Sequence, residues 1–225
     1  MPLAAYTDLC IDAVDAPVAT RFWAEVLGLD PHLQADGDGE LRDQDGHVIV
    51  RVNGVAESKT VKNRVHIDIS AESVRQVIDA GATVVEELPR WTVLADPDGQ
   101  EFCVFVRDEP ITQRLYELAW DCPQGPEPSH AQAAWWQAVV GGVVVDDERG
   151  FSWLEQIPDA PFFSMDFVGV PEPKTVKNRV HIDVTTDDVD ALLSHGATLL
   201  QPRGGELGWD VLADPDGNEF CAFTS

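Results

Sequence analysis

Positive charge is scarce in this chain. Lysine and arginine together number 15 against 40 aspartates and glutamates, which gives a formal net charge of −25 at pH 7 over 225 residues. Binding to nucleic-acid phosphates or to anionic lipid requires a basic surface that offsets electrostatic repulsion. We therefore expect neither nucleic acid nor a membrane surface as a partner.

Long apolar segments and paired cysteines are also missing. No run approaches the ~18 apolar residues that a membrane-spanning helix needs. The first residues, MPLAAYTDLCID, have neither the basic start nor the apolar stretch of a signal peptide. The cysteines show no CxxC spacing and are expected to be free thiols; they are Cys10, Cys103, Cys122 and Cys221. P-loop, GxGxxG and GxSxG motifs are absent too. These absences predict a cytoplasmic protein that uses neither nucleotide-binding loops nor a serine nucleophile elbow.

What the chain does contain is a long internal repeat. The segment KTVKNRVHID occurs at residues 59–68 and 174–183, and VLADPDG follows at 93–99 and 211–217. The two blocks recur after 115 residues (174 − 59) and 118 residues (211 − 93), which is the size of a domain and too long for a solenoid repeat. We predict two domains, at residues 1–110 and 111–225.

Each half contains the same succession of expected strands and helices. In the first half, an apolar strand at residues 6–12 precedes an amphipathic helix at 16–28, and the turn Asp45–Gly46 then indicates a meander of antiparallel strands. The pattern restarts at RVHIDIS. Four tryptophans at matching places in the copies are expected in the core: Trp23 and Trp136, Trp91 and Trp209. This order predicts an α+β fold of four βαβββ modules, two in each half.

Three segments of the first half carry a family resemblance: LCIDAVDAPVATRFWAEVLG, KTVKNRVHIDIS and WTVLADPDGQEFCVF. Together with the paired modules, they make the chain resemble the vicinal oxygen chelate superfamily, and specifically its glyoxalase-like domains, which often occur as tandem pairs in bacteria. The resemblance covers nearly the whole chain. It implies two tandem domains with cup-shaped antiparallel sheets, in which the two modules of each half face each other across one cup. Active members, such as glyoxalase I and the extradiol dioxygenases, hold a divalent metal ion on the cup floor. Bleomycin-resistance proteins bind ligands there without metal.

Strand alternation predicts which side chains face the cup. In RVHIDIS the apolar Ile67 and Ile69 should point to the helix layer, which leaves His66 and Asp68 on the concave side. The same rule applied to QEFCVF and to the second copy adds Glu101, Cys103, His181, Asp183, Glu219 and Cys221. We expect the chemistry of the protein among these side chains.

The resemblance also implies where a metal ion would bind. Metal-binding members take one ligand from the first strand and one from the last strand of each module. The matching first-strand positions are Asp8, His66, Glu117 and His181, and the last strands of the second modules offer Cys103 and Cys221. The remaining position is Arg51 in one half and Asp166 in the other. Because cysteine replaces the glutamate typical of the family and Arg51 is no ligand, the expected cofactor is either a divalent metal ion or none.

The lysines are confined to the repeated segments, where arginines accompany them. They are Lys59, Lys62, Lys174 and Lys177, and the arginines are Arg64 and Arg179. One interpretation is an anion-binding loop, in which Lys62 and Arg64, or Lys177 and Arg179, contact a carboxylate or phosphate of a ligand. The other is a loop held by ion pairs to acidic residues of its own domain. Both interpretations stay open at this point.

Two function classes are compatible with these residues. In the first, the chain is a lyase, isomerase or dioxygenase in which a metal polarises a carbonyl or enediolate, and Glu101 or Glu219 moves the proton. In the second, it is a metal-free binding protein whose polar floor, including Asp68 and Asp183, orients an apolar or aromatic ligand. Either class predicts a small-molecule partner, anionic if the basic loops receive it, and a monomer or homodimer.

Overall fold

The computed structural model describes residues 1–205 and 207–224, which form four βαβββ modules. Module 1 comprises β1 (Ala5–Ala13), α1 (Ala16–Leu27), β2 (Asp30–Leu33), β3 (Gly39–Arg42) and β4 (Val48–Gly54). Module 2 comprises β5 (Val65–Ala71), α2 (Val74–Asp79), β6 (Thr83–Glu87), β7 (Thr92–Ala95) and β8 (Glu101–Val106). Module 3 comprises β9 (Leu115–Pro123), α3 (Pro126–Val140), β10 (Val143–Asp146), β11 (Ser152–Glu155) and β12 (Ser164–Val170). Module 4 comprises β13 (Val180–Thr186), α4 (Val189–Ser194), β14 (Thr198–Gln201), β15 (Asp210–Ala213) and β16 (Glu219–Thr224). The predicted α+β class and module count are confirmed.

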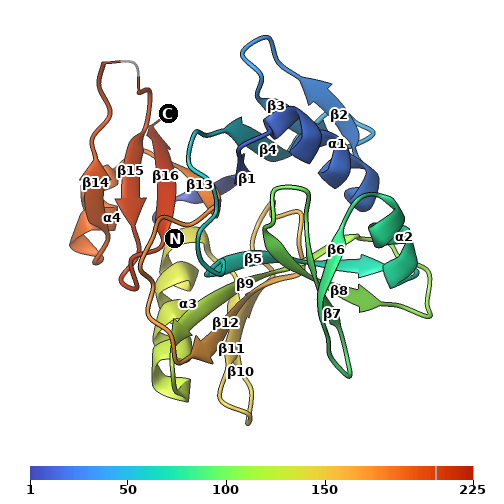
Figure 1. Ribbon diagram of the computed structural model, residues 1–225. Helices are drawn as coiled ribbons and strands as arrows, with labels where there is room; N and C mark the ends of the chain where they lie inside the picture. The colour runs from blue at the N-terminus through green and yellow to red at the C-terminus, as the bar shows by residue number, and fades with distance from the viewer. Residues whose placement is uncertain (206, 225) are drawn as a thin grey trace.

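The modules combine into two eight-stranded sheets, and each sheet takes one module from each half. Sheet A has the order β14-β15-β16-β13-β1-β4-β3-β2, and sheet B has the order β10-β11-β12-β9-β5-β8-β7-β6. In Figure 1 the blue first module therefore lies beside the orange and red fourth module, with the green and yellow modules in the other sheet. The prediction that the two modules of one half share a cup is wrong. The antiparallel pairs β1–β13 and β5–β9 join the halves instead.

The sheets are mixed and not wholly antiparallel. In each module the last strand runs parallel to the first and lies beside it. Thus β1 is parallel to β4, and β5 is parallel to β8. The other neighbours within a module are antiparallel, as in β3 with β4. This arrangement puts the first and last strands of every module at the centre of a sheet, where the predicted site residues lie.

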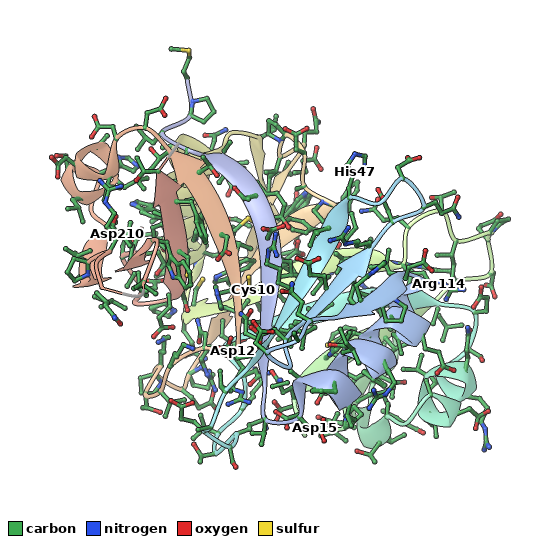
Figure 2. All side chains as sticks on the ribbon, turned by 90° about the horizontal axis from the view of Figure 1, so that it is seen from above. Cys10, Asp12, Asp15, His47, Arg114 and Asp210 are labelled. Atoms are coloured by element: carbon green, nitrogen blue, oxygen red, sulfur yellow. The ribbon has the colours of Figure 1, made fainter. Side chains whose placement is uncertain are left out.

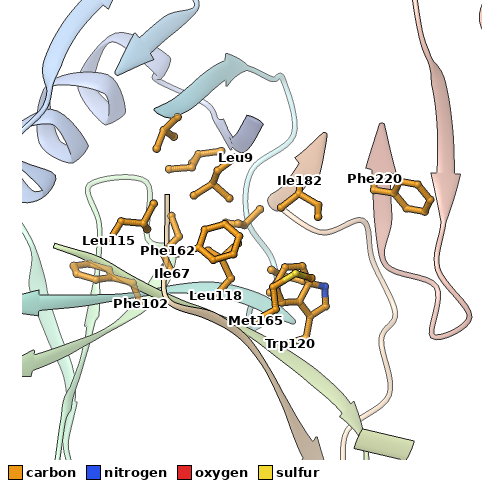
Figure 3. Close-up of a cluster of buried hydrophobic side chains, with 14 of the residues drawn as sticks. Leu9, Ile67, Phe102, Leu115, Leu118, Trp120, Phe162, Met165, Ile182 and Phe220 are labelled. Atoms are coloured by element: carbon orange, nitrogen blue, oxygen red, sulfur yellow. The ribbon is translucent and has the colours of Figure 1, made fainter. Parts of the chain in front are cut away.

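The core lies between the two sheets. Leu9 and Ile182 of sheet A and Ile67 and Leu118 of sheet B are at most 1 % exposed, and Figure 3 shows them in one cluster of buried side chains. Because side chains alternate along a strand, the neighbours of these residues point to the opposite, outward faces. The polar faces of both sheets are therefore on the outside of the sandwich.

The longer helices α1 and α3 connect the sheets. Asp15 caps α1 by accepting a hydrogen bond from the Val18 amide, and Gly28 ends it in the left-handed conformation, as predicted (φ 71°). Trp23 of α1 packs against Phe102 of sheet B, with ring centroids 5.0 Å apart. In α3, Trp136 packs in the same way against Phe220 of sheet A at 5.3 Å. Trp23 and Trp136 are core residues, as predicted. Among the described residues, no helix combines the length and apolar character needed to cross a membrane.

Candidate functional site

The concave face of each sheet encloses a cavity, and we call these cup A and cup B after their sheets. Cup A has a volume of about 930 Å³ and cup B of about 860 Å³. The side chains that alternation assigned to the concave faces line these cavities. In cup B they are His66, Asp68, Glu101 and Cys103, and in cup A they are His181, Asp183, Glu219 and Cys221.

Because the halves exchange modules, the predicted metal positions are grouped differently from the sequence order. Asp8 faces Asp183 across the β1–β13 pair and lies in cup A. Glu117 faces Asp68 across the β5–β9 pair and lies in cup B. Glu117, from the second half of the chain, therefore lies in cup B with His66 and Cys103 from the first half. Asp8, from the first half, lies in cup A with His181 and Cys221 from the second half.

The remaining metal position differs between the cups. Arg51 of β4 lies beside Cys10 of β1 in cup A, whereas Asp166 of β12 lies beside Ala119 of β9 in cup B. Arg51 donates from Nε to Asp8 Oδ2 at 2.7 Å and from Nη1 to Glu40 Oε1 at 2.6 Å. A cation already neutralises the carboxylates at these positions. The residues of cup A therefore do not fit a metal ion at the positions typical of the family.

Cup B differs from cup A because Asp166, an acidic residue, occupies the position at which cup A has Arg51. Burial and the charge of Asp166 raise the pKa of Glu117, and burial raises the pKa of Asp166. Burial disfavours the charged form of His66, but the neighbouring Asp68 raises the pKa of this imidazole overall; His66 Nδ1 lies 2.8 Å from Asp68 Oδ1. Burial and the charge of Asp68 raise the pKa of the Cys103 thiol. The floor of cup B thus gathers acidic groups with too little positive charge among them.

Cup B holds chemical groups that can ligate a divalent metal ion, and His66, Asp68 and Cys103 offer ligand atoms that lie within 4.8 Å of one another. The four positions carry imidazole, thiol and two carboxylates, on His66, Cys103, Glu117 and Asp166. All are groups that ligate Zn²⁺. The raised pKa values of the two carboxylic acids indicate a site that a cation would stabilise. Asp166 completes this set; in the sequence it occupies the metal position at which the other half has Arg51.

Aromatic side chains form much of the wall of cup B. Trp91 stacks with Phe105 at 5.8 Å, and Tyr116 stacks with Phe163 at 6.2 Å. Phe151 and Trp153 also line the cavity. The prediction that Trp91 and Trp209 belong to the core is wrong: Trp91 lines cup B and Trp209 lines cup A. Alternation with the fully buried Leu94 was the signal that could have placed Trp91 on the cup face.

Glu101 and Glu219, the expected proton carriers, are held by lysines of the repeated segments. Lys59 Nζ donates to Glu101 Oε1 at 2.6 Å, and Lys174 Nζ donates to Glu219 Oε1 at 2.8 Å. Burial opposes the charge of Glu101, but the hydrogen bonds from Lys59 and the Asn63 amide lower its pKa overall. A carboxylate held in this way is a weak base, and this geometry favours a structural role.

The other basic side chains of the repeat connect the two halves. Lys62 donates to Asp121 at 2.6 Å, and Arg64 Nη1 lies 3.0 Å from the same carboxylate. In the second copy, Lys177 donates to Asp12 and Arg179 donates to Asp98 at 2.9 Å. The expectation of ion pairs within one domain is therefore wrong for these four residues, because every carboxylate partner belongs to the opposite half. The repeated segments fasten the halves together.

Comparisons with known proteins agree with this architecture. A family model described as a glyoxalase-like domain matches residues 8–105 and 119–223. The structure of glyoxalase I from Zea mays superposes with a TM-score of 0.68 at 13 % sequence identity, covering 97 % of this chain and 92 % of that one. A putative dioxygenase from Bacillus subtilis gives a TM-score of 0.63 at 14 % identity, covering 99 % of this chain and 86 % of that one. None of the curated proteins compared matches the chain significantly.

The two family matches span most of the chain, and both solved structures share the fold over nearly its full length. Small-molecule binding or transformation is the activity that this fold supports. The chain is a tandem member of the glyoxalase-like domain family, within the vicinal oxygen chelate superfamily.

Proposed function

We propose that cup B is the reaction site of the protein and that it transforms a small molecule with the help of a divalent metal ion. The observation that carries the proposal is the acidic floor, where burial raises the pKa values of Glu117 and Asp166 and, among the described residues, no arginine or lysine forms an ion pair with either carboxylate. His66, Cys103, Glu117 and Asp166 are the residues that would hold the ion. When bound, the metal would polarise a carbonyl or enediolate oxygen, as in lyase, isomerase and dioxygenase chemistry.

The residues of the chain supply orientation and proton transfer. Asp68, hydrogen-bonded to Nδ1 of His66, fixes the ring so that its other nitrogen faces away from Asp68. Lys59 keeps Glu101 ionised, so Glu101 is a weak candidate for moving a proton. Glu117 could do so through an oxygen that does not hold the ion. The aromatic wall at Trp91 and Phe105 would hold an apolar or aromatic part of the substrate.

A second candidate function is metal-free binding of a cationic aromatic molecule. Cys103 stands where the family has glutamate, and its thiol lies 4.0 Å from His66 Nδ1. A positively charged ligand would neutralise the acidic floor as a metal would, and the aromatic wall suits a cation near ring faces. An anionic ligand has less support, because each lysine already has a carboxylate partner.

Metal loading of matched variants tests the proposal. Asp166→Arg gives cup B the residue that cup A has at Arg51. We expect metal-free wild-type protein, loaded with Zn²⁺ and freed of excess ion, to retain one more equivalent per chain than Asp166→Arg, as measured by elemental analysis. Arg51→Ala, the control in cup A, should leave the cup B equivalent in place.

Equal metal content in the wild type and Asp166→Arg would contradict the metal-dependent function. Quenching of tryptophan fluorescence by a cationic aromatic probe, lost in Asp166→Arg, would then favour the binding function.

A further inference from the structure

Cup A contains a second group of potential metal ligands, which shares His181 with the family positions but adds Cys10 and Asp183 to it. Cys10, His181 and Asp183 are all buried, and they offer sulfur, nitrogen and oxygen atoms that lie within 4.8 Å of one another. Cys10 lies midway along β1, which crosses the centre of sheet A (Figure 2). Its partner across the β1–β13 pair is His181. The three side chains therefore meet on adjacent central strands.

Two polar atoms in this group have no hydrogen-bond partner among the described residues. His181 is 8 % exposed and Asp183 is 4 % exposed, and both His181 Nδ1 and Asp183 Oδ1 are buried without a hydrogen bond. His181 Nε2 lies 3.6 Å from Asp183 Oδ1, which is too long for a hydrogen bond. Native proteins rarely leave buried polar atoms unpaired, so such a pair indicates a missing partner.

The group does not use Asp8, the metal position that Arg51 neutralises. Arg51 binds Asp8 and Glu40, whereas the Cys10 thiol donates to Asp183 Oδ2 at 3.3 Å. The residue of cup B that corresponds to Cys10 is Ala119, since it faces His66 as Cys10 faces His181. Cup B therefore has no thiol at this position, and its own group of close potential ligands, His66, Asp68 and Cys103, takes its thiol from β8 instead.

We propose that Cys10, His181 and Asp183 form a second metal site, which binds Zn²⁺ or a similarly soft divalent ion. Thiolate, imidazole and carboxylate together are ligands of zinc, and thiolate selects against hard ions such as Mg²⁺ and Ca²⁺. On binding, the Cys10 thiol transfers its proton to solvent as the metal–sulfur bond forms. The ion would take one nitrogen of His181 and one oxygen of Asp183 as its further ligands.

The fourth position of this site has two possible occupants. Cys221 of β16 faces Asp183 on the side away from β1 and lines the same cavity. If Cys221 binds, the ion is closed off and structural; if it does not, the fourth position is open to water or to a small molecule in the cup. Closed and open coordination are the usual difference between structural and catalytic zinc.

Cobalt binding tests the site independently of cup B. Co²⁺ bound by thiolate gives a sulfur-to-metal charge-transfer absorption, and Cys103→Ala removes the cup B thiol from this signal. We expect Cys103→Ala to show the absorption on titration with Co²⁺ and to lose it on addition of Zn²⁺. Adding Cys10→Ala gives cup A the alanine that cup B has at Ala119, and it should weaken Co²⁺ affinity by about 100-fold or more. Even residues that only hydrogen-bond to metal ligands contribute about 10- to 100-fold to metal affinity, and a ligand should contribute more.

Two further variants separate ligand loss from damage to the fold. Cys122→Ala removes a buried thiol that lies outside both cavities and should leave the absorption unchanged. His181→Gln, made in the Cys103→Ala protein, should weaken binding as Cys10→Ala does while circular dichroism stays native. Absence of the absorption in Cys103→Ala, or its survival after both Cys10→Ala and His181→Gln, would overturn the proposal. The metal-dependent function of cup B is tested separately through Asp166→Arg.

Discussion

At the scale of single residues, the basic side chains of the repeated segments differ in burial although they share partners. Arg64 has a side chain only 9 % exposed, whereas that of Lys62 is 48 % exposed, and both contact Asp121, whose side chain is 4 % exposed. Breaking a buried pair leaves an uncompensated charge, but an exposed pair is weakened by solvent screening. The two residues therefore stabilise the protein to different extents despite similar distances.

We expect Arg64→Ala to lower the free energy of unfolding by about 3 kcal/mol and Lys62→Ala by less than ~1 kcal/mol. Urea denaturation of the metal-free protein measures both. Arg75→Ala, which breaks an exposed pair with Asp79 on helix α2, is the surface control and should be close to neutral. Equal losses for Arg64→Ala and Lys62→Ala would show that burial does not set the strength of these pairs.

The acidic floor of cup B predicts a dependence of stability on pH. The pKa of Glu117 is raised above its ordinary value of 4.5 by burial and by Asp166. Between the ordinary and the raised value the folded protein binds more protons than the unfolded chain, so stability falls as pH rises through this window. At lower pH, where Glu117 is protonated in both states, the effect vanishes.

Replacing Glu117 with neutral glutamine should remove this penalty. We expect metal-free Glu117→Gln to be more stable than the wild type at about pH 8, by about 1 kcal/mol or more, with the difference lost near pH 4.5. Thermal unfolding across this range measures the effect. Glu109→Gln, at an exposed position, should track the wild type at every pH. A Glu117→Gln variant less stable than wild type at high pH would mean that the carboxylate is favourably solvated or paired.

At the scale of secondary-structure elements, helix α1 approaches strand β3 very closely. A Cβ atom added at Gly39 would lie 2.0 Å from Thr20 Oγ1 and 2.9 Å from Thr20 Cβ. Gly39 has no positive φ angle that would strain another residue. Steric contact with α1 is therefore the reason that glycine is needed at this position.

We expect Gly39→Ala to lower the free energy of unfolding by roughly 1–3 kcal/mol, the usual cost of overpacking. Thr20→Ala combined with Gly39→Ala should recover part of this loss, because the hydroxyl and methyl groups of Thr20 are removed but its Cβ remains. Gly208→Ala, where nothing lies within 4 Å of the added atom, is the neutral control. Additive effects in the double variant would show that the two residues do not interact.

Local sequence patterns predicted the elements well because they depend on neighbouring residues. Gly28 ends α1 as expected, and the alternation of Ile67 and Ile69 placed His66 and Asp68 on the cup face. The same alternation would have placed Cys10 on the cup face of β1, since its neighbour Leu9 is fully buried. The sequence prediction selected Asp8 instead of Cys10, because Asp8 occupies the first-strand metal position typical of the family.

At the scale of the whole molecule, the pairing of modules could not be read from the repeat. β5 reads VHIDISA and β13 reads VHIDVTT, so each offers nearly the same face to a neighbouring strand. β1 pairs with β13 and not with β5, a choice that depends on contacts far apart in the chain. The consequence is functional, because this exchange puts Asp166 into cup B with His66 and Arg51 into cup A with His181.

The exchange also predicts how the halves behave when they are separated. In fragment 1–110, β1 and β5 would lack their partners β13 and β9, and the core residues Leu9 and Ile67 would lose the sheet edges that cover them. An unpaired strand at the edge of a sheet recruits another strand. Because each half carries one module for each sheet, a fragment can pair with a second copy of itself.

We therefore expect fragments 1–110 and 111–225 to form dimers or larger species when expressed alone, as measured by light scattering during size-exclusion chromatography. Mixed after refolding, they should associate one to one and regain the near-ultraviolet circular dichroism of the intact protein. Only this complex joins Glu117 and Asp166 to His66, so the equivalent of Zn²⁺ that depends on Asp166 should return with it and be missing from either fragment alone. A folded, monomeric half would mean that the modules of one half can close a cup by themselves, and that the pairing across halves is a preference and not a requirement.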